Sequence, residues 1–221
     1  LAGTVAQETA ELLAGVCVAA YNLSFFVKGS SDVLKVRLVD ETGTILANSN
    51  VRVSQDWTKQ NLTLRPKSTS HEASLQLGLD SGGEVYLDMV SLFPKKTWKN
   101  RKNGLRVDLA EKLEALNPAF VRFPGGCWVE GDTMATSYRW KDTIGELSQR
   151  RTQHNLWGYE VGHGLGYHEY LQLCEDLGAE ALFVINCGMS HKEVVPMDRM
   201  QEYVQDALDA IEYANGDIST R

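Results

Sequence analysis

The spacing of hydrophobic residues changes once along this chain, near residue 94, and this change restricts the possible folds more than any other feature of the sequence. Before that point apolar and polar residues alternate, as at Leu34, Val36 and Leu38. After it, apolar residues recur every three or four positions, as at Leu105 and Leu109. A period of two is that of a half-buried strand, and a period near 3.6 is that of a helix. We therefore expect two regions of different architecture.

Residues 1–94 predict a β-sandwich of the jelly-roll type. The alternating runs lie at 21–27, 34–38, 75–79 and 85–89, with further strand residues at 45–53 and 62–64. Turns rich in Gly, Ser and Asp separate them, and short alternating strands between such turns are typical of a sandwich. Trp57 falls among these strands. We expect it to be a core side chain.

Residues 104–221 predict an incomplete α/β (TIM) barrel segment, after a basic linker at residues 95–103. The expected order is a helix that ends before Pro118, a strand at 120–123, a helix at 167–177 closed by Gly178, a strand at 182–185, and a third helix after Pro196. The run at 182–185 is entirely apolar, which favours a strand buried on both faces. A closed barrel needs eight strands, and only two are visible. We therefore expect roughly strands 2 and 3 of a barrel, from a longer protein.

The loop after the first of these strands is the strongest candidate for a site. Gly125 and Gly126 follow Pro124, and Cys127 and Glu130 come directly after them. Loops at the carboxyl ends of parallel strands carry the sites of α/β proteins, and glycine lets the backbone approach a ligand closely. A tight strand-to-helix turn without any site explains the same residues, so the segment alone leaves both readings open.

Composition excludes several classes of function. The 221 residues carry a net charge of −7, which argues against a nucleic-acid surface, and no apolar run is long enough to span a membrane. Cys17, Cys127, Cys174 and Cys187 form no C-x-x-C pair, and Cys174 and Cys187 are expected in the core. No pair of histidines has the spacing of metal ligands. We expect no metal and no cofactor.

A series of short motifs lies at residues 121–127 and 129–131, 138–141 and 143–145, 154–159, 164–166, 175–180, and 184–188. In this order, the motifs resemble those of the α-L-arabinofuranosidases of glycoside hydrolase family 51. The ordered set is specific, although each motif alone is not. Residues 1–94 look like the carbohydrate-binding-module-like jelly roll of this family, on the looser basis of strand spacing and residues 88–94.

The resemblance implies a retaining hydrolase that removes terminal α-L-arabinofuranosyl groups from arabinoxylan or arabinan. In this chemistry one carboxylic acid protonates the leaving oxygen and a second carboxylate is the nucleophile. The family's acid/base follows an asparagine at the end of the fourth barrel strand, and its nucleophile comes later. Neither position lies in this sequence, so no catalytic residue is assigned to it and the chain alone is expected to be inactive.

The resemblance also assigns roles to residues. Gly126, Cys127, Trp157 and Asn186 are predicted to bind substrate, and Glu130 to support the pocket from its loop. Three of these residues have a simpler alternative: Cys127 as a buried thiol, Trp157 as a core side chain, and Asn186 as a residue that only orients its neighbours. For Glu130 the alternative is a catalytic carboxylate, which the family motif does not place there. For Trp57 an exposed platform for a sugar ring is the alternative to a core position. A nucleophilic cysteine is not expected, since no motif supplies a histidine partner.

Two other functions remain open: a carbohydrate-binding protein without turnover, and a barrel glycoside hydrolase of other specificity. The expected partner is an arabinose-containing polysaccharide or oligosaccharide, and neither nucleic acid nor membrane is expected. Asn22-Leu23-Ser24 and Asn61-Leu62-Thr63 match the glycosylation sequon and weakly favour secretion. A secreted or periplasmic location is expected for the parent protein, although this sequence begins with Leu1 and contains no signal segment.

Overall fold

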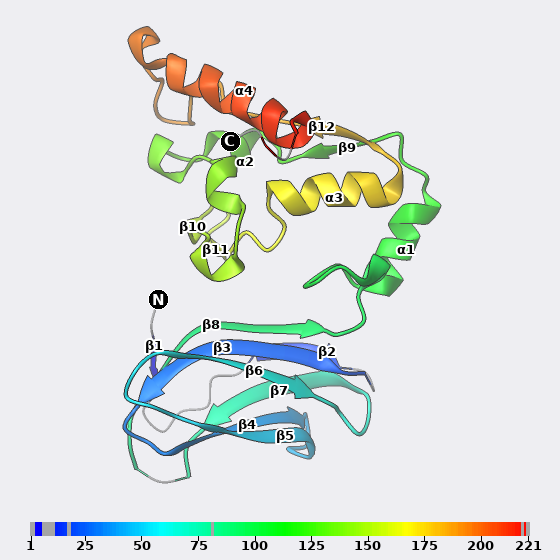
Figure 1. The fold of residues 1–221 in the computed structure, drawn as a ribbon, viewed down its shortest axis with the longest axis vertical. Helices are drawn as coiled ribbons and strands as arrows, with labels where there is room; N and C mark the ends of the chain where they lie inside the picture. The colour runs from blue at the N-terminus through cyan, green and yellow to red at the C-terminus, as the bar shows by residue number, and fades with distance from the viewer. Residues whose placement is uncertain (1–2, 6–11, 17–18, 81, 218, 220–221) are drawn as a thin grey trace. The chain divides into compact units, whose positions relative to one another are not determined.

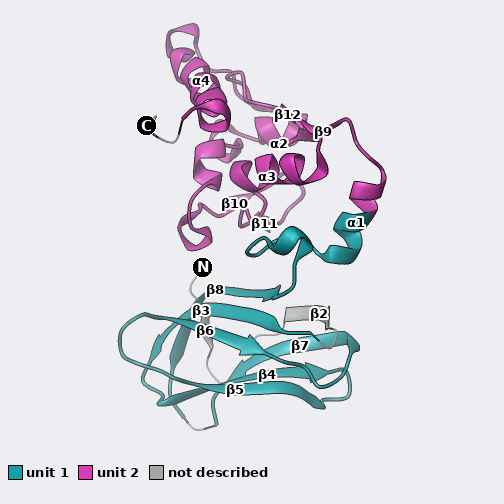
Figure 2. Cartoon of the chain, turned by 45° about the vertical axis from the view of Figure 1, so that its right-hand side comes forward, with its two compact units in different colours: residues 1–111 teal, residues 112–221 magenta. Residues whose placement is uncertain are grey.

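The computed structural model describes residues 3–5, 12–16, 19–80, 82–217 and 219. The chain forms two compact units, residues 1–111 and residues 112–221 (Figure 2). The boundary lies within a helix, and the predicted divisions at residues 94 and 104 stay predictions. No helix among the described residues is long and apolar enough to cross a membrane.

The N-terminal unit is a β-sandwich, as predicted. Its strands are β1 (Gly3–Val5), β2 (Leu12–Val16), β3 (Tyr21–Gly29), β4 (Val33–Asp40), β5 (Ile45–Arg52), β6 (Thr58–Leu64), β7 (Ser70–Gly78) and β8 (Val85–Pro94). They form two four-stranded antiparallel sheets, in the orders β1-β8-β3-β6 and β2-β7-β4-β5 (Figure 1). Each sheet takes strands from distant parts of the sequence.

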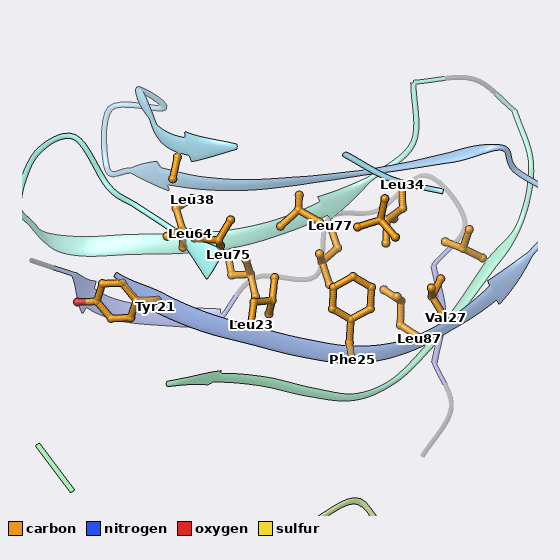
Figure 3. Close-up of a cluster of buried hydrophobic side chains, with 14 of the residues drawn as sticks. Tyr21, Leu23, Phe25, Val27, Leu34, Leu38, Leu64, Leu75, Leu77 and Leu87 are labelled. Carbon is orange, nitrogen blue, oxygen red and sulfur yellow. The ribbon is translucent and has the colours of Figure 1, made fainter. Parts of the chain in front are cut away.

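The sandwich core follows directly from the alternation of the strands. Leu23, Phe25 and Val27 of β3 point inward and are almost completely buried, while the residues between them point outward. They meet Leu75 and Leu77 from β7 of the other sheet (Figure 3). Burying a side chain of this size stabilises a fold by about 1.5–3 kcal/mol. The inward rows of the two sheets therefore hold the unit together.

Trp57 does not belong to this core, so the expectation of a core tryptophan is wrong. Its side chain is 41% exposed, and the ammonium group of Lys28 lies 5.1 Å from the centre of its ring. Inward positions alternate along β6 up to Leu64, and Trp57, which precedes the strand, falls on the outward side of that alternation. The strand period therefore turns the indole away from the interior.

The connection to the second unit contains a 3-10 turn, η1 (Trp98–Asn100), and helix α1 (Val107–Ala115). The helix ends before Pro118, as predicted from the residue preceding a proline. Its leucine stripe is not covered, because Leu109, Leu113 and Leu116 are all exposed.

The C-terminal unit alternates strands and helices around one short parallel pair. Its elements are β9 (Phe120–Phe123), α2 (Gly126–Glu130), η2 (Met134–Thr136), η3 (Trp140–Thr143), η4 (Leu147–Gln149), β10 (Gln153–His154), β11 (Glu160–Val161), α3 (Tyr167–Leu177), β12 (Glu180–Phe183), η5 (Met197–Arg199) and α4 (Gln201–Asn215). Strand β12 runs parallel to β9, with Phe183 beside Phe123. Helix α3 ends at Gly178 in the left-handed conformation, as predicted.

Aromatic side chains form the core of this unit. Tyr167 and Tyr170 of α3 pack against Phe123 and Phe183, with ring centres 5.1 Å apart for Phe123 and Tyr170 and 4.2 Å for Tyr167 and Phe183. The Tyr170 hydroxyl donates a hydrogen bond to the Val121 carbonyl at 2.8 Å. Cys174 is buried in the same cluster, as predicted.

Two expectations for the second strand are wrong. Leu182 and Ile185 are 49% and 41% exposed, so the apolar run is not buried on both faces. Within the described residues, β12 has only β9 as a neighbour, and α3 covers one face of the pair. Cys187 is exposed rather than in the core, because it lies in the loop after β12. The described residues contain no closed barrel.

Candidate functional site

The loop after β9 turns directly into a short helix. Strand β9 ends at Phe123, the peptide bond to Pro124 is cis, and Gly125 precedes α2 in an extended conformation. Gly126 and Cys127 begin the helix and are both exposed. A side chain added at Gly126 would meet nothing within 4 Å. The loop thus presents open backbone and a free thiol at the carboxyl end of a parallel strand, and Cys127 is not a buried thiol.

Asn186, which follows β12, connects the α2 turn to the loop after that strand by hydrogen bonds. Its side-chain amide donates to the carbonyl oxygens of Val129 and Met189, each at 2.9 Å. Its side-chain oxygen accepts from the backbone N–H groups of Gly188 at 2.7 Å and Met189 at 3.0 Å. These four bonds use both donors and both acceptor positions of the amide. A substrate contact would therefore have to displace one of them.

The loop of residues 188–195, which the sequence did not predict, contacts the same turn through side chains of three consecutive residues. His191 Nε2 lies 3.0 Å from the Glu130 carboxylate, and Lys192 Nζ lies 2.6 Å from that of Asp132. The Glu193 carboxylate accepts from the backbone N–H of Met134 at 2.6 Å. Three consecutive residues thus contact positions 130, 132 and 134. The run of three charged or ionisable residues after Cys187 was the only sequence signal for this loop, which spans residues 188–195.

Trp157 lies on a different element, the turn between β10 and β11. The side-chain oxygen of Asn155 accepts from the backbone N–H of Trp157 at 2.9 Å, and Gly158 completes the turn with a positive φ. The indole is 61% exposed. It is therefore not a core side chain, and its flat face is available to a ligand.

His163, two residues beyond β11, is the least satisfied buried group of this unit. Its ring is almost fully buried against Trp128 of α2 and Tyr138, with ring centres 6.2 Å and 5.8 Å apart. Its Nε2 has no hydrogen-bond partner in the described part of the chain. Burial lowers the pKa of His163, so the neutral ring is favoured. Burial also raises the pKa of Tyr138 to about 12.

The described residues contain no group of three or more His, Cys, Asp or Glu that could hold a metal ion. Cys17 lies outside the described residues. The two carboxylates nearest the turn, Glu130 and Asp132, are each held by a basic side chain. The α2 turn offers exposed backbone and a thiol, and the β10–β11 turn offers an exposed indole. Exposed backbone, a thiol and an indole are groups that suit the binding of a ligand.

Replacing Asn186 by alanine should lower the stability of the C-terminal unit by about 2 kcal/mol, because four hydrogen bonds to backbone groups are lost. Urea unfolding measures this change. Asn215→Ala is the matched control, since it removes one exposed bond to the Ile211 carbonyl and should change stability by less than about 0.5 kcal/mol. Equal changes for the two variants would show that Asn186 does not hold the turn.

Comparisons with known proteins agree with this arrangement of strands and loops. Residues 112–221 match the family model described as the α-L-arabinofuranosidase 1 domain. An extracellular exo-α-L-arabinofuranosidase of Streptomyces chartreusis is 40% identical over 91% of the chain, and α-L-arabinofuranosidase 2 of Arabidopsis thaliana is 36% identical over 90%. The chain spans only 26% and 30% of the length of these two relatives.

A solved structure resembles the chain over nearly its whole length. The arabinose-bound α-L-arabinofuranosidase MgGH51 superposes with a TM-score of 0.88 and 32% identity, over 98% of this chain and 38% of its own. Sequence and structure thus point to the same relatives. The chain belongs to the α-L-arabinofuranosidases of glycoside hydrolase family 51, of whose members it covers a part.

Proposed function

We propose that the protein containing this chain is a retaining hydrolase of terminal α-L-arabinofuranosides in arabinoxylan or arabinan, and that this chain forms one wall of its arabinose pocket. The observation that carries the proposal is the α2 turn, an exposed glycine and thiol at the carboxyl end of a parallel strand in a member of this family. Trp157 supports it, since an exposed indole offers a flat apolar surface and an N–H donor to a sugar.

The β9-α3-β12-α4 series is proposed to be two successive strands and helices of a (β/α)8 barrel. Both strands are parallel, and a helix follows each strand-end loop. Leu182 on β12 and Val204, Leu208 and Ile211 on α4 are exposed. In a complete barrel, further strands and helices would cover such apolar surfaces.

The two catalytic carboxylates are proposed to come from other parts of the longer protein. A retaining glycosidase needs one carboxyl group that donates a proton and one that attacks the sugar. Glu130 and Asp132 are engaged with His191 and Lys192, which suits residues that hold the loop in place. Asn186, with its amide saturated by backbone groups, positions the α2 turn in this proposal and does not itself bind sugar.

Secretion of the whole protein is also part of the proposal, because the Streptomyces relative is described as extracellular. The substrate polymer would then be a cell-wall polysaccharide outside the cell. The proposed pocket recognises the terminal arabinose, which arabinoxylan and arabinan share.

The test is hydrolysis of an aryl α-L-arabinofuranoside by the full-length protein. Trp157→Ala should lower kcat/KM about tenfold or more, because one aromatic contact with the sugar is lost. Tyr159→Ala is the matched control on the same hairpin, with a side chain that is 58% exposed, and should leave kcat/KM unchanged. An equal fall in both variants would assign the effect to the hairpin and not to the indole.

The 221-residue chain provides a second arm of this experiment. Its rate of hydrolysis of the same substrate should not exceed the uncatalysed rate in buffer, since we propose that both catalytic carboxylates lie outside it. Turnover by this chain would contradict the placement of the carboxylates. A full-length protein that binds arabinoxylan without hydrolysing any arabinofuranoside would instead be a carbohydrate-binding protein.

A further inference from the structure

The segment between β8 and α1 concentrates positive charge in a chain that is acidic overall (Figure 1). Residues 89–107 contain six Lys or Arg and no Asp or Glu, although the whole chain has a net charge of −7. Neither the sandwich core nor the proposed arabinose pocket uses these basic side chains. A cluster of one sign on a chain of the opposite sign creates a local field that attracts a ligand of opposite charge.

The basic residues lie on an ordered loop that is closed at its base. The backbone N–H of Trp98 donates to the Leu105 carbonyl at 2.9 Å. Inside the loop, the Thr97 hydroxyl donates to the Arg101 carbonyl. This bond brings the peptide group that precedes Lys102 back beside the start of the loop. Thr97 and Trp98 are buried and anchor the loop to its unit.

The backbone of the loop is held in an uncommon conformation. Lys99, Asn100 and Asn103 have φ angles of 52°, 57° and 52°. This left-handed region suits asparagine but is uncommon for lysine. Non-glycine residues kept there cluster at functional sites, because the surrounding contacts must hold the conformation against its cost. The Lys99 ammonium group lies 4.9 Å from the centre of the Trp98 ring. The loop therefore holds its cations in a defined arrangement.

Three lysines of this loop have no counter-charge. Lys95, Lys96 and Lys102 are exposed, and their side chains make no ion pair or hydrogen bond with any residue that the structure describes. Asp108, the first acidic residue after the loop, is paired with Arg106 at 2.7 Å. Three uncompensated ammonium groups so close in the sequence form a surface that attracts anionic groups.

The chemistry of the loop decides which polyanion fits it. Single-stranded nucleic acids bind through stacking aromatic rings as well as cations, whereas the one aromatic ring of the loop, Trp98, is only 6% exposed. Membrane surfaces and protein partners need apolar anchors beside the charges, and residues 95–103 contain no other apolar side chain.

The remaining side chains of the loop suit a charged sugar polymer. A lysine is a hydrated point charge that demands no planar, bidentate partner, unlike arginine. Asn100 and Asn103 add amide groups, which can bond to hydroxyl groups as donors or acceptors. Carboxylates spaced along a hydroxyl-rich chain, as in a polysaccharide that contains uronic acids, match this combination of groups.

We propose that this basic loop, defined by Lys95, Lys96 and Lys102, binds the carboxylate groups of an acidic polysaccharide. Each lysine pairs with a uronate of the polymer, and no ring stacking is involved. The inference rests on the proposed function for the identity of the polymer, which is the one that carries the arabinose side chains. It narrows the substrate class to polymers that contain acidic sugars besides the neutral terminal arabinose. The loop shares no residue with the proposed arabinose pocket, so binding here does not require hydrolysis.

Binding of the full-length protein to immobilised polygalacturonate, a uronate polymer without arabinose, tests this site. The unchanged protein should bind at about 50 mM NaCl, and its affinity should fall about tenfold or more at about 200 mM, because the contacts are between exposed charges. The triple variant Lys95→Glu, Lys96→Glu and Lys102→Glu should lower the affinity about tenfold or more. Arginine at the same three positions keeps the charges and should retain most of the binding.

The matched control changes the net charge equally at another surface of the sandwich. Arg52, Arg65 and Lys67 are exposed, and the triple variant Arg52→Glu, Arg65→Glu and Lys67→Glu should bind polygalacturonate nearly as well as the unchanged protein. A thermal melt confirms that each variant is folded. Linear arabinan, which is uncharged, should bind the unchanged protein and the loop variant equally.

Three results would overturn the proposal: no binding of the unchanged protein to polygalacturonate, equal weakening in the two glutamate variants, or equally tight binding of DNA at the same salt concentration. Normal hydrolysis of the aryl arabinofuranoside by the loop variant, with weaker binding to polygalacturonate, supports a site separate from the arabinose pocket. Binding that depends on the loop, in a protein that hydrolyses no arabinofuranoside, supports the basic loop as a binding site and contradicts only the proposed hydrolytic function.

Discussion

Replacement of Gly166 by alanine is expected to unfold the C-terminal unit. A Cβ built at this position would lie 1.9 Å from the carbonyl oxygen of Thr143 and 3.0 Å from the Arg150 guanidinium. The first contact is with backbone and cannot be relieved by rotating a side chain. Gly166 is also the residue before α3, so the start of the helix would have to move away from η3. The free energy of unfolding should fall by about 3 kcal/mol or more, which is at the upper end of the cost of overpacking a core.

Gly164→Ala is the control for this prediction, two residues away. A Cβ at Gly164 would meet nothing within 4 Å, and the residue has no positive φ. This variant should unfold within about 0.5 kcal/mol of the unchanged protein, as surface substitutions usually do. Urea unfolding followed by the near-ultraviolet signal of the aromatic cluster measures both. Similar unfolding midpoints for the two variants would show that α3 and η3 do not approach as closely as the structure places them.

Arg150→Ala should lower the stability of the C-terminal unit by a similar amount, and Arg150 lies beside Gly166. Arg150 is buried, and its guanidinium makes two bonds of 2.7 and 2.8 Å with the Glu169 carboxylate. It also donates to the carbonyl oxygens of Gly145 and His163. Removing one partner of such a pair leaves a poorly solvated charge and unpaired carbonyls, at a cost of about 3 kcal/mol or more. Arg106→Ala, which removes an exposed pair with Asp108, should cost less than about 1 kcal/mol.

The pH dependence of stability checks the same contact. Desolvation raises the pKa of Glu169, but the hydrogen bonds from Arg150 and the Gly166 N–H outweigh it, and the net pKa is below 4.5. Since the folded pKa is depressed, this stabilisation is complete above the pKa of the unfolded chain and is lost as the pH falls through the folded value. Arg150→Ala should flatten the fall in stability below pH 4.5. If the stability of Arg150→Ala fell as steeply at low pH as that of the unchanged protein, the proposed role of the Arg150–Glu169 pair would be wrong.

The sandwich was predictable because its signal is local. Leu23, Phe25 and Val27 are buried and Asn22 and Lys28 are not, simply because successive side chains of a strand point to opposite faces. The same holds for α3, whose end at Gly178 could be identified from the sequence pattern. Which strands pair was not predictable, since β3 lies between β8 and β6, and such contacts depend on residues far apart in sequence.

The candidate site was predictable only in part. The glycine turn and Trp157 could be identified by their motifs, and both are exposed in loops. The contact between Asn186 and the Val129 carbonyl joins residues 57 positions apart, and no sequence period reports such a pair. The partners of the His191–Glu130 and Lys192–Asp132 pairs are also far apart in the sequence, and the pairs were missed for the same reason.

The prediction of burial failed where burial depends on a neighbouring element and not on the strand itself. The run at 182–185 has the composition of a doubly covered strand, yet Leu182 and Ile185 are exposed because a single strand pairs with β12 among the described residues. Hydrophobicity reports what a side chain prefers, and the surrounding chain decides whether that preference is met.

By itself, the sequence determined the β-sandwich of the N-terminal unit and the family, because periodicity and ordered motifs are properties of neighbouring residues. Only the tertiary structure decided that Trp57 faces outward beside Lys28 and Tyr86, and that Asn186 is saturated by backbone groups. These facts depend on strand register and on loop contacts between distant residues. Such contacts form only when the whole unit folds, so a local pattern does not encode them.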